Sequence, residues 1–270
     1  MAVANFYMHH VYALMLDGKL HQAPIPPDVK RVLDIGTGTG KWAVDFGDMY
    51  PSASVIGTDL SPIQPSFVPP NVSFEIDDCC DEWLFPQPFD LIHIRGLFGC
   101  VADWDKLYNQ ALQHLQQGGY IEQLETTMLL RSDDGSADGT VMREFQQLGL
   151  ESSAKFGKSL NTAEEMKAGI IKAGFVDVTE HSFKLPVGSW PKDRQLKALG
   201  RYQRLVWEES IEMWSMMLLT KVLRWSREKV DAYLMHVRKD LRNQDIHSYQ
   251  DVRVCYGRKP TAEESAQATA

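Results

Sequence analysis

One stretch, residues 31–59, limits what this chain can fold into more than any other. It reads RVLDIGTGTGKWAVDFGDMYPSASVIGTD: an apolar run leads into three alternating glycines, a helix-like segment follows, and a second apolar run ends at Asp59. Glycines at the end of a strand let the backbone turn sharply and approach a ligand more closely than a Cβ allows. An acidic residue about 20 positions later, at the tip of the next strand, can accept hydrogen bonds from ribose hydroxyls. The stretch therefore predicts a nucleotide-type cofactor site.

The rest of the chain alternates apolar runs with helical patterns, which favours an α/β fold: a parallel sheet with helices on both faces. We expect strands at 32–36, 54–59, 72–76, 89–95, 119–125, 175–185 and 250–257. We expect helices at 5–20, 40–50, 103–116, 138–155 and 162–173, the last opened by a Thr162-x-x-Glu165 capping box. Ligands of such sheets bind at the carboxyl ends of the strands, so the last residues of each strand carry the most information.

Two cofactor classes compete for the glycine loop. A dinucleotide site has the spacing G-x-G-x-x-G, whereas this chain has G-T-G-T-G. The compact spacing, and Asp34 just before it, suit a zwitterionic ligand with an amino group better than a pyrophosphate; the amino-acid end of S-adenosylmethionine is such a ligand. Asp77 and Asp78 would lie where an adenine amino group could be held. Together these residues favour S-adenosylmethionine.

Several longer blocks carry a more specific resemblance: LDIGTGTGKWAVDFGDMYP, VIGTDLSPIQP, VPPNVSFEIDD, FDLIHIRG, GGYIEQLE and YGRKP. From about residue 5 to 260 the chain is similar to the fungal LaeA-like class I S-adenosylmethionine methyltransferases of the trans-aconitate-methyltransferase-like group. The resemblance implies a seven-stranded Rossmann-like sheet with an antiparallel last strand, helices on both faces and an inserted helical lid. The cofactor contacts expected on this pattern are Asp34, Gly36, Thr37, Gly38, Gly40, Asp59, Leu60, Asp77, Asp78, Cys79 and Arg95.

Four parts of the chain follow from this pattern. Residues 1–27 form an N-terminal capping helix and linker, 28–185 together with 250–260 form the cofactor-binding domain, 186–249 form the helical lid, and 261–270 form a flexible tail. The lid is expected because so long a connection between two strands is uncommon without a function. Its first helix carries a wide apolar arc that includes Trp207 and Trp214, so one edge could pack on the domain and the other line a substrate pocket. We expect Tyr7, Trp207 and Trp214 to contact substrate, with simple burial as the competing interpretation.

Methyl transfer is an in-line displacement, so holding the acceptor in position supplies much of the catalysis. A hydroxyl, phenol or amine acceptor must also lose a proton, which calls for a base. The candidate bases are His9, His10, His93, His236 and His247, and Glu122 and Glu125 could orient an acceptor. Of these we choose His10, His93, His236 and Glu125 as catalytic residues. Packing inside the sheet competes as a role for His93, and capping or ion pairing at the sheet edge competes for Glu125. A lid of Trp, Met and Leu favours a small, largely apolar or aromatic acceptor.

Composition narrows the alternatives. The net charge is −8 and no Lys/Arg cluster is longer than a dipeptide, which argues against a nucleic-acid substrate. Four cysteines without a CxxC motif indicate neither a disulfide framework nor a metal site. No apolar run reaches the roughly 18 residues of a membrane span, and we expect a cytoplasmic protein, or a nuclear one if its role is regulatory.

The leading hypothesis is a methyltransferase acting on a small molecule of secondary metabolism. Two alternatives stay open: a LaeA-like regulator or scaffold that acts through a protein partner, and a methyltransferase fold recruited to a reaction other than methylation. A homodimer or a protein partner is compatible with each of them.

Overall fold

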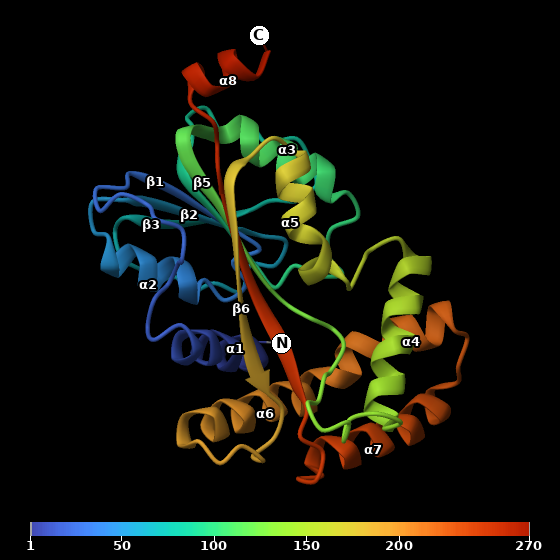
Figure 1. Ribbon diagram of the computed structural model, residues 1–270. Helices are drawn as coiled ribbons and strands as arrows, with labels where there is room; N and C mark the ends of the chain where they lie inside the picture. The colour runs from blue at the N-terminus through green and yellow to red at the C-terminus, as the bar shows by residue number, and fades with distance from the viewer. Residues whose placement is uncertain (1, 270) are drawn as a thin grey trace.

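The structure is a computed structural model that describes residues 2–269, with side chains from residue 7 to residue 267. Its centre is a seven-stranded sheet with the strand order β3-β2-β1-β4-β5-β7-β6 (Figure 1). The parallel strands are β1 (Arg31–Ile35), β2 (Ser54–Asp59), β3 (Val72–Ile76), β4 (Phe89–Arg95) and β5 (Leu115–Thr126). The last strand, β7 (Tyr249–Arg258), runs antiparallel between β5 and β6 (Val176–Pro186). The predicted Rossmann-like sheet with an antiparallel last strand is confirmed.

Helices cover both faces of this sheet. They are α2 (Lys41–Met49) on one face, and α3 (Trp104–His114) and α5 (Thr162–Lys172) on the other. α2 packs through Trp42 and Phe46, whereas α3 and α5 pack through residues such as Leu107 and Ile170. Successive side chains of a strand point to opposite faces, so the central strands, covered on both faces, are largely apolar.

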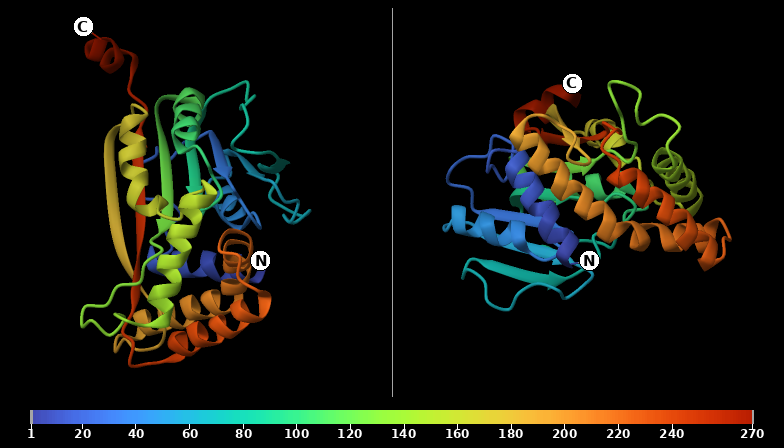
Figure 2. Two further views of the ribbon diagram at one scale, coloured as in Figure 1. Left: turned by 90° about the vertical axis from the view of Figure 1, so that its right-hand side faces the viewer. Right: turned by 90° about the horizontal axis from the view of Figure 1, so that it is seen from below.

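A further layer of helices lies beyond the carboxyl ends of the parallel strands (Figures 1 and 2). Its members are α1 (Ala2–Met15), α4 (Val141–Phe156), α6 (Arg194–Met217), the π-helical turn η1 (Leu218–Val222) and α7 (Arg227–Arg242). α4, α6, η1 and α7 share one apolar core that includes Phe145, Trp207, Leu219 and Leu234. This core groups α4 with the inserted helices, although the sequence analysis assigns residues 138–155 to the sheet domain. We call α1, α4, α6, η1 and α7 the helical layer.

α1 bridges the sheet and the helical layer. It packs against α6, and its Val11 and Tyr12, together with Leu16 directly after the helix, share an apolar cluster with Leu124 of β5 and Val252 of β7. The helix ends at Met15 rather than near residue 20, because the chain turns through Asp17 and Gly18, both of which have positive φ. α1 is thereby placed over the tips of the central strands.

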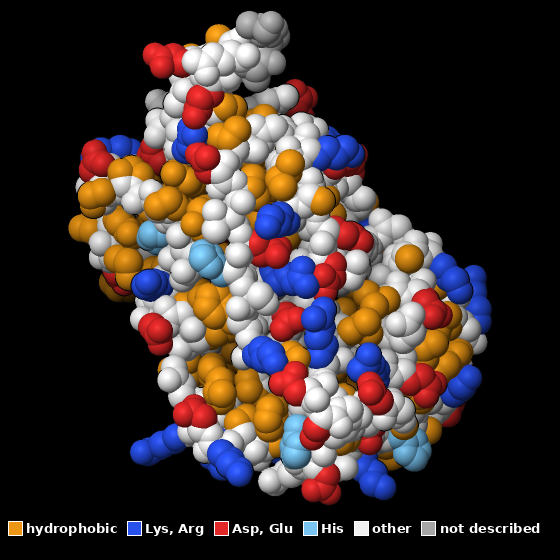
Figure 3. Space-filling model, viewed as in Figure 1, with side chains coloured by type: hydrophobic (Ala, Val, Ile, Leu, Met, Phe, Trp, Pro, Cys, Tyr) orange, Lys and Arg blue, Asp and Glu red, His pale blue; other side chains and the backbone are white. Residues whose placement is uncertain are grey.

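Two further local expectations differ from the structure. The capping box at α5 is absent, because Asn161 occupies the cap position and the Thr162 hydroxyl donates to the carbonyl of Ser159 (3.3 Å). The tail, expected to be flexible, contains the short helix α8 (Ala262–Thr269), and Arg258 joins it to the sheet through Glu264 (2.8 Å). No helix in residues 2–269 is long and apolar enough to cross a membrane. On the face drawn in Figure 3, basic and acidic side chains lie interspersed.

Candidate active site

The glycine loop joins β1 to α2 at the carboxyl edge of the sheet. Gly36, Gly38 and Gly40 have φ of 67°, 57° and 74°, values that side-chain-bearing residues rarely adopt. A Cβ at position 36 would overlap the side chain of Leu97, and one at position 40 would overlap Phe74. The loop therefore needs glycine for its backbone shape and also for the closeness of its neighbours.

Asp59 ties this loop to the tip of β2. Its Oδ2 accepts a hydrogen bond from the Gly38 N–H (2.8 Å), and its Oδ1 accepts one from the Ser61 N–H (2.9 Å). The side-chain amide of Gln64 donates to the carbonyls of Gly38 (2.7 Å) and Ser61 (2.9 Å), which closes the same turn. Leu60, directly after Asp59, leaves 67% of its surface exposed. The predicted ribose site thus has an ordered carboxylate beside an open apolar side chain.

Asp34 and His93 form a buried pair beneath the loop. Asp34 Oδ1 lies 2.7 Å from His93 Nδ1, and its Oδ2 accepts from the Thr37 hydroxyl (2.5 Å). The His93 ring stacks on Trp42 with centroids 3.7 Å apart, and burial lowers the pKa of His93. Asp34 is only 2% exposed and Thr37 only 8%, unlike the partly exposed Asp59, so burial leaves little of either side chain for a cofactor, and their contacts with it stay predictions. His93, 1% exposed, supports the loop from beneath, which favours packing over a role as base.

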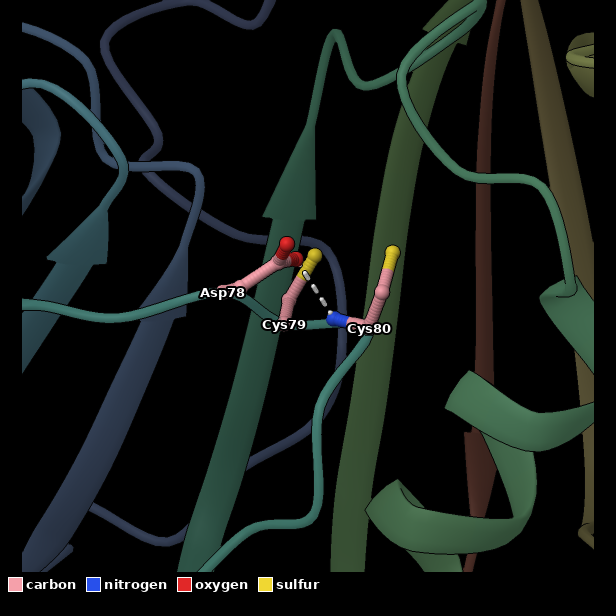
Figure 4. Close-up of side chains that lie close together, drawn as sticks. All are labelled: Asp78, Cys79 and Cys80. Carbon is pink, nitrogen blue, oxygen red and sulfur yellow. Dashed lines mark hydrogen bonds between the residues drawn. The ribbon is translucent and has the colours of Figure 1, made fainter.

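Asp77, Asp78 and Cys79 follow β3 and reach the same edge. The Asp77 N–H donates to the Asp59 carbonyl (3.2 Å), and Asp78 Oδ1 accepts from the Cys80 N–H (2.9 Å; Figure 4). The Asp78 carboxylate and the thiols of Cys79 and Cys80 lie within 4.8 Å of one another, a spacing that could hold a metal ion and that the sequence analysis did not expect. Burial and the neighbouring Cys80 raise the pKa of the Cys79 thiol, which favours its protonated form and disfavours metal binding.

Arg95, at the tip of β4, meets α1. Its Nη2 lies 3.2 Å from His9 Nδ1, and its guanidinium lies over the Tyr12 ring, 5.3 Å from the centroid. His9 Nε2 in turn lies 2.8 Å from Asp45 Oδ2 on α2. Since arginine can only donate, His9 accepts at Nδ1 and donates from Nε2 to Asp45. The Tyr12 hydroxyl pairs with Thr126 of β5 (3.1 Å), so α1 is fastened to three elements of the sheet domain.

The inward-facing histidine of α1 is His9. His10, the predicted base, is exposed and meets the Tyr202 ring edge-on at 4.9 Å. Consecutive helical residues point about 100° apart, so a one-residue difference moves the imidazole from the site to the α6 side. The geometry therefore favours His9 over His10 as the histidine that faces the sheet, and His10 as the base stays a prediction. Burial lowers the pKa of His9, which favours its neutral form.

Glu125, near the end of β5, is fully buried. Its Oε1 accepts from the Leu97 N–H (3.0 Å) and from the side-chain amide of Gln123 (3.2 Å), whereas its Oε2 is buried without a well-aligned hydrogen bond. Burial raises the pKa of Glu125 to about 7, although the nearby Phe98 N–H helps to lower it. A carboxyl group that titrates near neutral pH and keeps one oxygen without a well-aligned hydrogen bond is suited to proton transfer. Glu122, on the opposite face of β5, instead accepts backbone hydrogen bonds from Gln22 and Ala23 and anchors the linker.

The remaining predicted residues lie at positions that differ in burial: one is in the core, two are partly exposed and one is exposed. Trp207 is only 2% exposed and donates from Nε1 to Gln250 (2.9 Å), so it belongs to the core, which favours simple burial over the expected substrate contact. Trp214 is partly exposed and meets the ring of Phe98, in the loop after β4, at 6.3 Å. Tyr7 is partly exposed, 6.1 Å from the Tyr202 ring. His236 is exposed on α7, on the side away from the buried stripe, so the structure places it away from the other candidates.

Comparison with known proteins identifies this arrangement. Residues 7–180 match the family described as a methyltransferase domain. Methyltransferase pytC of Aspergillus terreus is 40% identical over 256 residues, which cover 94% of this chain and 79% of pytC. This chain belongs to the LaeA-like methyltransferases. The secondary metabolism regulator laeA of Aspergillus fumigatus is 33% identical, over 95% of this chain and 69% of laeA. The predictions of the family and of a methyltransferase that uses S-adenosylmethionine are confirmed.

Solved structures agree on the fold of this LaeA-like methyltransferase. The YcgJ protein from Bacillus subtilis superposes with a TM-score of 0.53 at 20% identity, covering 94% of this chain and all of YcgJ. Phosphoethanolamine N-methyltransferase 2 of Haemonchus contortus, in complex with S-adenosyl-L-methionine, gives 0.53 at 17% identity. It covers 95% of this chain, which spans about half (53%) of that protein's length.

From the sequence, His9 is a candidate base beside the preferred His10, but the contacts that join α1 to the strand tips of this LaeA-like methyltransferase are not foreseen. His9 and Tyr12 lie three residues apart, a spacing that places them on one face of a helix, so periodicity contained a signal for their shared orientation. Their partners Asp45, Arg95 and Thr126 are distant in the chain. No local pattern relates these positions, because only the docking of α1 brings them together.

Proposed function

We propose that this LaeA-like methyltransferase transfers a methyl group from S-adenosylmethionine to an oxygen, nitrogen or carbon atom of a small, largely apolar or aromatic molecule of fungal secondary metabolism. The observation that carries this proposal is the meeting of the glycine loop, Asp59 and Glu125 at one edge of the sheet. The relatives support the substrate class, since pytC is named a methyltransferase and laeA a regulator of secondary metabolism.

The residues at the strand tips fit this cofactor. The tight, Cβ-free turn at Gly36, Gly38 and Gly40 exposes backbone groups to the amino-acid part, and Asp59 retains lone pairs for ribose hydroxyls. Leu60 offers an apolar surface for the adenine ring, and Asp77, Asp78 and Cys79 would lie at its edge. When bound, the cofactor supplies an electrophilic methyl group. The work left to the chain is to hold the acceptor in line and to receive its proton.

Glu125 is the residue we assign to proton transfer. Its Oε2, which lacks a well-aligned hydrogen bond, can accept a proton from an acceptor hydroxyl or amine, while Oε1 stays hydrogen-bonded to the Leu97 N–H. Phe98, directly after Leu97, meets Trp214 of the helical layer. The two rings would form an apolar wall near this carboxyl group, which favours an aromatic acceptor.

Labelled cofactor tests the proposal. The purified protein is incubated with methyl-labelled S-adenosylmethionine and an extract of a fungal culture, and the products are separated by mass. We expect a labelled small molecule heavier by one CH₂, at a yield that falls about 100-fold or more in Glu125→Gln. An absence of labelled product with protein that binds the cofactor would contradict the proposed activity.

A second candidate is regulation through a protein partner, which is favoured by the identity to laeA over most of this chain. In the same experiment this function predicts label on a protein band, or no transfer together with stable capture of a partner. Label on a small molecule would count against it.

A further inference from the structure

Arg95 is a cation without a carboxylate partner. Among residues 7–267 no carboxylate oxygen lies within 4 Å of its guanidinium, and its one hydrogen bond to the described chain goes to His9. Its Nε and Nη1 atoms are neither hydrogen-bonded nor fully buried, so both can donate to a ligand. Arg95 is nevertheless partly buried, and burial lowers its pKa, although a guanidinium stays charged in proteins.

Two other partly buried arginines of this chain are neutralised by carboxylates. Arg253, with 18% of its side chain exposed, contacts Glu164 (2.6 Å) and Glu180 (4.0 Å). Arg258, with 16% exposed, contacts Asp177 (2.6 Å) and Glu264 (2.8 Å). Removing a charge from water costs free energy unless an opposite charge compensates it. Arg95 has no such compensation at the carboxyl end of β4, the edge where ligands bind. Arg31, the other partly buried arginine without a carboxylate among the described residues, lies at the opposite end, where β1 begins.

The carboxylates near Arg95 already have other hydrogen-bond partners. Asp34 uses both oxygens on His93 and Thr37, and Asp45 uses its two oxygens on His9 and Lys41. The Tyr12 ring covers one face of the guanidinium. Gly96, the next residue along the chain, has no heavy atom within 4 Å of the place a Cβ would take, so the chain is open to its surroundings directly after Arg95.

We propose that Arg95 binds a carboxylate in the active site and that His9 acts as its positioning residue. A carboxylate matches the paired N–H groups of a guanidinium and would supply the missing counter-charge. Within the proposed function, it comes either from the amino-acid end of the cofactor or from an acidic acceptor. His9, which donates to Asp45, accepts from Nη2 of Arg95 and so holds that side of the guanidinium in place. The Nε and Nη1 groups of Arg95 then remain free to donate to the ligand.

Calorimetry with two ligands tests the cofactor as the source. S-adenosylhomocysteine and its decarboxylated analogue differ in the carboxylate alone. We expect wild type to prefer the intact ligand by about 10- to 100-fold, and Arg95→Gln to lose that preference while binding the analogue as wild type does. His9→Gln should reduce the preference in part, and Arg201→Gln, an exposed arginine on α6, should leave it unchanged. A merely structural role of Arg95 would weaken both ligands equally.

A second arm tests the acceptor as the source. Benzoate is titrated into each protein with and without S-adenosylhomocysteine. Benzoate binding to wild type that is lost in Arg95→Gln, with an unchanged preference between the two nucleosides, would assign the carboxylate to the acceptor. The inference is overturned if Arg95→Gln matches wild type in both arms. Failure of wild type to bind either nucleoside would refute the proposed cofactor instead, and the benzoate arm would still decide the role of Arg95.

Discussion

The tips of the parallel strands and the helical layer above them bury different kinds of side chain. At the strand tips, Asp34, His93 and Glu125 are buried and joined to their surroundings by specific hydrogen bonds. The core of the helical layer is apolar, with residues such as Trp207 and Leu234 at its centre. Reaction chemistry needs charges whose protonation the protein controls, whereas a wall needs shape alone. We therefore expect substitutions in the two regions to affect different measurements.

The largest effect on folding should come from Trp207 in the helical layer. Trp207→Ala removes a fully packed ring and one of the two hydrogen bonds that the Gln250 side-chain oxygen accepts, so the free energy of unfolding should fall by about 3–5 kcal/mol. Trp214→Ala, at a partly exposed ring seven residues later, should cost less than half as much. Urea unfolding measures both. Equal losses would remove the distinction between core and wall within this helix.

Substitution of Glu125 at the strand tips should instead raise the free energy of unfolding, by an amount that depends on pH. Its pKa in the folded protein is about 7, above its usual value, so the folded state binds more protons than the unfolded state between these two pH values. The stability contributed by protonated Glu125 is therefore present at low pH and is lost as pH rises through 7. Glu125→Gln should gain up to about 3 kcal/mol relative to wild type between pH 5 and pH 8.

Unfolding measured across this pH range checks the gain, with Glu209→Gln on the exposed side of α6 as the matched control. Methyl transfer gives an independent readout, because catalysis by a Glu125 base should increase through pH 7 in wild type and lose that dependence in the variant. A stability difference that is flat with pH would show that Glu125 titrates normally and would move proton transfer to another group.

The smallest effect should come from His236. It is exposed on α7 and away from the strand tips, so His236→Ala should change the free energy of unfolding by less than about 0.5 kcal/mol and leave methyl transfer unchanged. His9→Gln provides the contrast, since it breaks the link between α1 and Arg95 and should lower turnover. A loss of activity in His236→Ala would place α7 in the active site. It would contradict the assignment of the reaction chemistry to the strand tips alone.

Sequence predicted the strand tips well because the ends of parallel strands meet at one edge, so the order of elements alone brings Asp59, Asp77 and Arg95 together. Side-chain direction was harder to predict. His9 and His10 differ by one helical step, and only the docking of α1 selects between them. Trp207 and Trp214 share the apolar arc of α6, and the position of Gln250 decides which is core. Asp34, an acidic residue before the glycines, suits the cofactor's amino group in the sequence; its buried partner His93 lies on another strand, so no local pattern reveals that pairing.

The central claim is that the edge around Asp59 binds S-adenosylmethionine. Titration calorimetry of this cofactor into wild type and Asp59→Ala tests it most directly, with Asp105→Ala, an exposed residue of α3, as the control. We expect one site in wild type, the same affinity in the control, and a loss of about 100-fold or more in Asp59→Ala, because both the ribose contact and the bond to the Gly38 N–H are removed. No binding to wild type, or equal binding to Asp59→Ala, would contradict the account.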